Sequence, residues 1–296
     1  GEASSKEFSV LRHSLFPLRI EGGESPQVAG QTVTLLETRT LDPLLVPLLF
    51  AKTGGGVALD SSKIVLMMMD ILEKELQDIN VTLMGKHRTI AFFLDNDLAV
   101  RVLRRAFGSL QPAARARLLH EHVRLHEMHH LALTIKRFAY ELRGLSVPAQ
   151  RELLAIVAEW ALAPSKELAD YFFLKRFLHR TLSHHDRATE YFIQWLREEE
   201  PSLKPLSTEQ TVEWVLRQSE AGRLDIRQLA RRFYRLKFGT TPEEHLSQLD
   251  ADGVLAEAVA SIASIVGAKS AWVSQQPGDV SIATPRISQS VPLAAA

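Results

Sequence analysis

Five of the 11 histidines in this 296-residue chain lie within eleven residues, from His120 to His130. Within that run, His126, Glu127 and His130 match the pattern H-E-x-x-H. On an α-helix, residues four apart share a face, so the two imidazoles can bind one metal ion. The carboxylate of Glu127 then lies beside that ion and can take a proton from a water molecule. The pattern therefore predicts a Zn2+ site with Glu127 as the general base.

The helix that must carry this motif is predicted between Pro112 and Gly144. Proline is common in the first turn of a helix and glycine just after its end. Apolar residues recur at helical spacing after His130, as expected for a helix that packs into a core. The alternative is a solvated helix face rich in His and Glu, because the motif fixes only three positions.

The stretch Leu118–Arg176 resembles the H-E-x-x-H zinc metallopeptidases, in particular the gluzincins and, more distantly, the ImmA/IrrE-type group. The resemblance implies a zincin-like helical core in which His126 and His130 bind zinc and a Glu from a following helix is the third ligand. The element that starts at Glu167, which reads E-L-A-D, looks like the E-x-x-A-D of the ImmA/IrrE-type group but is one residue shorter. The implied activity is hydrolysis of peptide bonds, with Glu127 as the general base.

Several other residues are candidates for roles in the same site. Three of them are alternatives to Glu167 as the third ligand: Glu152, Glu159 and His122. Glu159 stands out because it lies among apolar residues, where a carboxylate needs a partner. Two further residues are candidates for stabilising the oxyanion that forms during hydrolysis: His185 and Tyr171.

The composition narrows the range of partners. Lys and Arg total 35 and balance 35 Asp and Glu, so no overall charge favours nucleic acid or a membrane surface. Cysteine is absent, so a zinc site must use His and carboxylate ligands, and a reducing cytoplasm is the expected location. No apolar run reaches the roughly 20 residues that cross a bilayer. We expect a cytoplasmic protein with a peptide or protein substrate and no membrane partner.

The elements around the motif predict a mainly α protein of the α+β type, divided into four regions. Residues 1–110 would form an N-terminal α+β region, and residues 111–200 the helical core with the H-E-x-x-H motif. Residues 201–273 would form a helical C-terminal region. Residues 274–296 are rich in Ser, Pro, Gln and Ala and are predicted to be a flexible tail.

A small antiparallel sheet is predicted in the N-terminal region from three β-prone segments: Gln31–Thr38, Ile79–Met84 and Thr89–Leu94. A helix is predicted between the first two, from Asp60 or Ser61 to Asp78, because Ile64, Met68 and later apolar residues form one stripe.

Two other protein classes fit parts of the chain. A di-iron carboxylate bundle would use Glu127 and His130 as an E-x-x-H pair, but it needs a second such pair. A non-catalytic binding or assembly protein with a degenerate metallopeptidase-like fold can use Arg223–Lys237 instead. This segment carries six Arg and Lys residues with Phe233 and Tyr234 between them, and such segments can bind nucleic acid.

Overall fold

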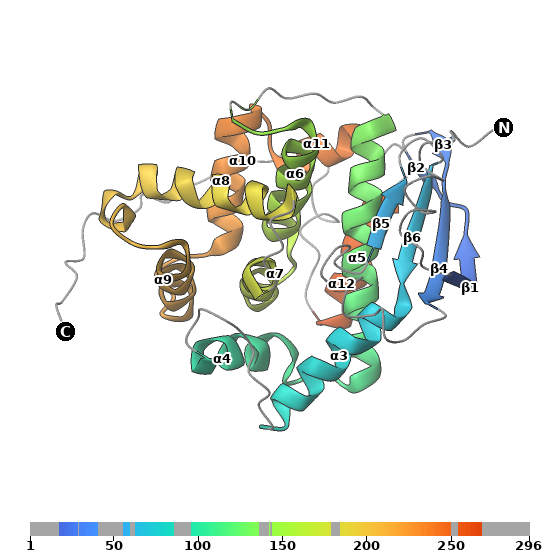
Figure 1. Ribbon diagram of the computed structural model, residues 1–296, viewed down its shortest axis with the longest axis horizontal. Helices are drawn as coiled ribbons and strands as arrows, with labels where there is room; N and C mark the ends of the chain where they lie inside the picture. Colours follow the sequence, from blue (N-terminus) through green and yellow to red (C-terminus); the bar gives the residue numbers. More distant parts are fainter. Residues whose placement is uncertain are drawn as a thin grey trace.

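The computed structural model describes residues 18–28, 30–40, 56–59, 63–85, 96–135, 142, 144–178, 184–249 and 254–267. A small sheet from the N-terminal part lies against helix α5 (Pro112–Ile135), and the other helices form the larger part of the molecule (Figure 1). The prediction of a mainly α protein with a small N-terminal sheet is confirmed. The predicted tail at 274–296 and the predicted strand Thr89–Leu94 lie outside the described residues.

The sheet has four strands in the order β1–β4–β6–β5. Their bounds are Leu18–Glu24 for β1, Thr34–Thr40 for β4, Ile64–Met68 for β6 and Gly56–Leu59 for β5. Strands β1 and β5 are antiparallel to their neighbours, whereas β4 and β6 are parallel to each other, so the sheet is mixed. A separate short hairpin pairs β2 (Gln27–Val28) with β3 (Gln31–Thr32).

The strand prediction over Gln31–Thr38 is confirmed by β3 and β4, but two neighbouring predictions are wrong. The start of the predicted helix is strand β6, and the predicted strand Ile79–Met84 belongs to helix α3 (Met69–Leu83). Helix α3 buries Ile71, Leu72 and Ile79 along one face. Short apolar runs fit either period, and pairing with a distant strand decided the outcome for β6.

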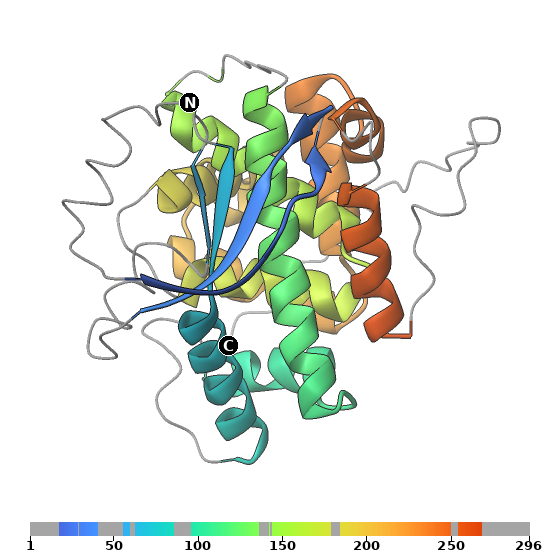
Figure 2. The ribbon, with the colours of Figure 1, turned by 90° about the vertical axis from the view of Figure 1, so that its right-hand side faces the viewer.

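The helices that follow have these bounds: α4 Asn96–Phe107, α6 Val147–Leu162, α7 Lys166–Leu178, α8 His184–Glu199, α9 Thr208–Glu220, α10 Ile226–Phe238, α11 Pro242–Leu249 and α12 Val254–Ile265, with a 3-10 turn, η2, at Pro201–Leu203. Helix α5 runs between the sheet on one side and the helical part on the other (Figures 1 and 2). Every residue from His122 to Leu133 is buried. The histidine-rich segment is therefore part of the core and not a solvated helix face.

No helix in the described ranges combines the length and the apolar character that a membrane span requires.

Candidate metal centre

The two histidines of the H-E-x-x-H motif both direct their Nε2 atom to one point on the buried face of α5. The Nε2 atoms of His126 and His130 lie 3.0 Å apart. Their rings are perpendicular, with centroids 4.5 Å apart. One turn of helix separates the two residues, so the backbone of α5 alone brings these two nitrogens together.

Helix α6 supplies the carboxylate that completes this group. The Oε2 atom of Glu152 lies 3.5 Å from His126 Nε2, 3.3 Å from His130 Nε2 and 3.0 Å from His185 Nε2. Zinc ligands at 2.0–2.1 Å from the ion in a tetrahedron are about 3.3–3.4 Å from one another. The four distances between these ligand atoms, 3.0–3.5 Å, are therefore close to the edge length of such a tetrahedron.

One atom of this group, the Oε2 atom of Glu152, lacks a hydrogen bond that would satisfy it, because it is buried and has no hydrogen-bond partner of good geometry among the described residues. Burial raises the pKa of Glu152, but its interactions with the imidazoles of His130, His185 and His126 more than offset this and hold the pKa well below its usual range. Ligand atoms of His126, Glu152 and His185 all lie within 4.8 Å of one another. These residues fit a divalent metal ion, and we call His126, His130, Glu152 and His185 the metal cluster.

The structure does not bring Glu167 to the metal cluster. Glu167 lies in the first turn of α7, whereas Arg176, which contacts His126, lies in the last turn. Nine residues of helix separate the two by about 13 Å. The electrostatic neighbours of Glu167 are Asp170 and Arg227. Of the alternatives, Glu152 is the residue whose carboxylate oxygen lies beside the Nε2 atoms of His126 and His130.

Glu159 contacts Nδ1 of His126, the ring nitrogen that faces away from the metal cluster. The Nδ1–H of His126 donates a hydrogen bond to Glu159, so that Nε2 is left to face the metal cluster. Arg176 Nη2 lies 2.9 and 2.8 Å from the two oxygens of Glu159. His122 Nε2 lies 3.2 Å from Glu159 Oε2, and its ring stacks on Phe172 at a centroid distance of 3.9 Å. Glu159 and His122 therefore position His126 and do not face the metal cluster themselves.

The protonation states follow from these contacts. Burial lowers the pKa of His126, but the charge of Glu159 more than offsets this and raises the pKa to about 9. Burial lowers the pKa of both His122 and His185 to about 4, which leaves their rings neutral at pH 7. Imidazole must be neutral to bind a metal ion, so an ion would replace the proton on His126 Nε2.

The permanently cationic side chains buried in and beside the metal cluster are fewer than the carboxylates there. Four carboxylates lie there: Glu75, Glu127, Glu152 and Glu159. Only two side chains that are always cationic compensate them, Lys175 beside Glu75 and Arg176 beside Glu159. Uncompensated charge in the interior is costly. Two negative charges remain. A divalent cation would balance both, whereas without an ion the proton on His126, whose pKa is raised to about 9, balances one, and the raised pKa of Glu127 favours a proton that balances the other.

Glu127 points into a small cavity beside the metal cluster. The cavity has a volume of about 10 Å³, roughly the space for one water molecule, and is lined by His122, Val123, His126, Glu127, Lys175, Arg176 and His185. Burial raises the pKa of Glu127. A general base works best when its pKa is close to the working pH, so this rise suits Glu127 to that role.

Tyr171, one of the two candidates for oxyanion stabilisation, is engaged elsewhere. Its hydroxyl donates a hydrogen bond to Glu75, and it is almost fully buried. The other candidate, His185, lies in the metal cluster. Two of the residues that complete the centre, Glu152 and His185, were therefore among several alternatives in the sequence, and only their position in space separates them from the rest.

Strand β5 places a glycine directly against Glu127. A Cβ atom placed on Gly56 would lie 2.6 Å from Glu127 Cγ, 2.9 Å from Glu127 Oε1 and 2.9 Å from Val123 Cγ1. Side chains essentially never approach this closely, so Glu127 needs a glycine at this point of β5.

We expect Gly56→Ala to displace the Glu127 carboxylate and to lower at least tenfold any hydrolytic activity that uses Glu127 as a base, with metal content unchanged. Gly22→Ala in β1 is the matched control, because its new Cβ would meet only the flexible end of Glu37 at 3.1 Å. Hydrolysis assays and metal analysis of both variants test this. Unchanged activity of Gly56→Ala would show that the position of Glu127 is not critical.

The basic segment on α10 does not present its aromatic rings to solvent. Phe233 and Tyr234 are fully buried. Three of its arginines form ion pairs, Arg227 with Asp225, Arg231 with Glu243 and Arg232 with Glu199. Base stacking on these rings is therefore not possible in this conformation.

No protein-family model, no curated protein and no solved structure matches the chain.

Proposed function

We propose that this protein is a zinc-dependent peptidase with His126, His130 and Glu152 as its zinc ligands and Glu127 as its general base. The observation that carries the proposal is the convergence of two Nε2 atoms and one carboxylate oxygen at 3.0–3.5 Å beside a buried glutamate. Two His and one Glu are the ligand set of several catalytic zinc sites that hydrolyse peptides.

Each residue has a defined task in this proposal. A zinc ion would polarise the scissile carbonyl and lower the pKa of a coordinated water to about 7. Glu127 takes the proton of the attacking water and passes it to the leaving amine. Glu159 fixes the orientation and tautomer of His126 through Nδ1, and Arg176 keeps Glu159 ionised.

The sheet offers a place for an extended substrate. Strand β5 is at the end of the strand order, and within the described residues no strand pairs with its outer edge. Its Gly56 lies directly against Glu127. An extended peptide that adds to such an edge by backbone hydrogen bonds would run past the general base. This supports a peptide as the substrate class.

Glu127→Gln tests the proposal directly. We expect zinc content to stay at one ion per chain while kcat/KM against a quenched fluorescent peptide library falls by roughly 10²–10⁴-fold, the usual loss when a general base is removed. Glu121→Gln, on the same helix but paired with Arg124 and away from the metal cluster, should leave activity unchanged.

The alternative is a non-catalytic binding or assembly protein that retains a metal site. One zinc ion per chain without peptidase activity in the wild-type protein would favour it. Equal activity of the wild-type protein and Glu127→Gln would likewise count against the peptidase proposal.

A further inference from the structure

His185 lies closer to the metal cluster than a three-ligand site requires. A catalytic zinc ion keeps three protein ligands and one open position. Yet His185 Nε2 lies 3.0 Å from Glu152 Oε2, nearer than His126 or His130 does. Its ring lies nearly parallel to that of His126, at 21° and a centroid distance of 6.0 Å. Its Nε2 therefore lies beside the same carboxylate oxygen that faces His126 and His130, and ligand atoms of His126, Glu152 and His185 all lie within 4.8 Å of one another.

We propose that His185 is a fourth protein ligand that closes the metal site in the resting protein and must leave the ion before a substrate can bind. This inference rests on the proposed function and adds a form of regulation to the same site. Zinc sites with four protein ligands are typical of structural zinc, because no position is open for water or substrate. A closed resting site would prevent the hydrolysis of peptides that cannot displace His185.

The positions of the four residues indicate that His185 is the ligand that leaves. His126 and His130 lie in the interior of α5, and Glu152 lies within α6. His185 is the second residue of α8, in a terminal turn, where helices open most readily. Its side chain is 28% exposed, compared with 5% for His126, 11% for His130 and 16% for Glu152.

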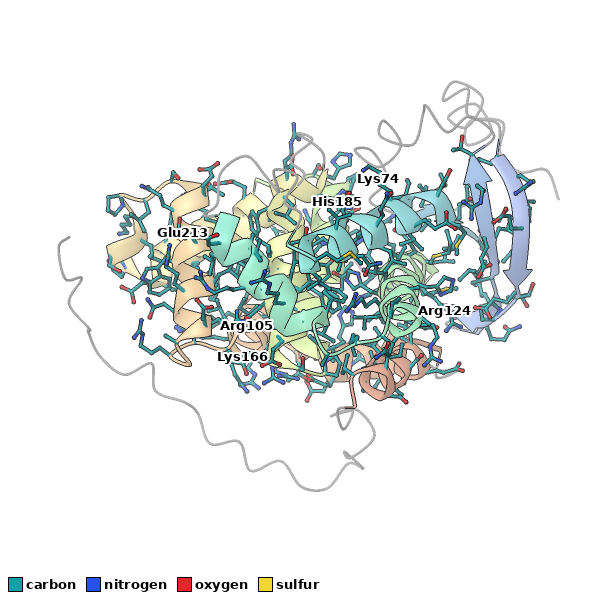
Figure 3. All side chains as sticks on the ribbon, turned by 90° about the horizontal axis from the view of Figure 1, so that it is seen from below. Lys74, Arg105, Arg124, Lys166, His185 and Glu213 are labelled. Atoms are coloured by element: carbon teal, nitrogen blue, oxygen red, sulfur yellow. The ribbon has the colours of Figure 1, made fainter. Side chains whose placement is uncertain are left out.

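The arrangement of the helices also indicates that His185 is the ligand that leaves. Figure 1 shows the N-terminal end of α8 directed toward α5, so His185 reaches the metal cluster from the end of a helix. Figure 3 shows His185 near the middle of the long axis of the molecule. A substrate that supplies its own metal-binding oxygen can therefore compete with one imidazole while three ligands keep the ion in place.

X-ray absorption spectroscopy of the zinc-loaded full chain tests the coordination. We expect three imidazoles and one carboxylate in the wild-type protein, and two imidazoles with additional oxygen in His185→Ala, with zinc still bound. His184→Ala, which changes the neighbouring exposed histidine, should retain three imidazoles. Two imidazoles in the wild-type protein would overturn the inference and leave the proposed function intact. If the wild-type protein holds no zinc after reconstitution, both are overturned.

A second measurement asks whether His185 blocks access. The protein is loaded with Co2+, and acetohydroxamate is titrated while the visible spectrum is recorded. We expect His185→Ala to bind acetohydroxamate at least tenfold more tightly than the wild-type protein or His184→Ala. Equal affinity in all three proteins contradicts a closing role for His185, whatever their peptidase activity.

Discussion

Glu152→Gln is expected to remove the bound zinc from the protein, whereas Glu167→Gln is expected to leave it in place. The Oε2 atom of Glu152 contacts the Nε2 atoms of three histidines, and no carboxylate of Glu167 reaches them within the described structure. Loss of a residue that only orients a ligand weakens metal binding roughly 10–100-fold. Loss of the ligand itself, together with its negative charge, should weaken binding by more than 100-fold.

Competition with a chromophoric chelator measures this difference. Glu167→Gln is the matched control, since it makes the same chemical change on the next helix and falls on the residue that the sequence pattern favoured. Zinc loss in Glu167→Gln with retention in Glu152→Gln would reverse the assignment of the third ligand. Retention in both variants would mean that the histidines alone hold the ion.

Arg176→Met is expected to destabilise the protein by about 3–5 kcal/mol, the usual cost of removing one partner of a buried ion pair. Arg176 contacts both oxygens of Glu159, and the two side chains are 10% and 1% exposed. Without Arg176, Glu159 loses its ion-pair partner and keeps only neutral His122 and the proton of His126 as neighbours, so its buried charge is compensated only in part. Urea unfolding with the metal chelated measures the effect, because chelation removes the contribution of metal binding to stability.

Arg232→Met serves as the control for a lost charge. Its pair with Glu199 is 43% and 31% exposed, and pairs of this kind contribute about 1 kcal/mol or less. The double variant Glu159→Gln with Arg176→Met should be less destabilised than Arg176→Met alone, because it no longer buries an unpaired carboxylate. If the double variant is as unstable as the sum of the single variants, the two residues act independently and the explanation fails.

Residue spacing was enough to predict the part of the site that lies within one helix. His126, Glu127 and His130 are placed by the regular geometry of α5, which is set by local hydrogen bonds and needs no distant partner. The apolar continuation after His130 also predicted correctly that this helix is buried. Most of the later helices were predictable for the same reason, since their periodicity and end signals are local.

The tertiary structure alone decided which carboxylate joins the histidines. Three glutamates follow the motif at plausible distances along the chain: Glu152, Glu159 and Glu167. Their positions in the sequence do not show which face of α6 or α7 is turned toward α5. Packing of α6 against α5 turned Glu152 toward Nε2 and Glu159 toward Nδ1 of the same histidine. The rotation follows from the sum of many apolar contacts, and no short motif records it.

The same reason applies to His185 and to the sheet. His185 reaches the metal cluster from α8, more than fifty residues after His130 in the chain, because α8 packs across α6. Strand β6 resembles a helical stripe in the sequence, and its parallel pairing with β4 supplied the hydrogen bonds that made it a strand. Local geometry can be predicted from spacing, whereas contacts between distant elements are selected by burial of the whole core.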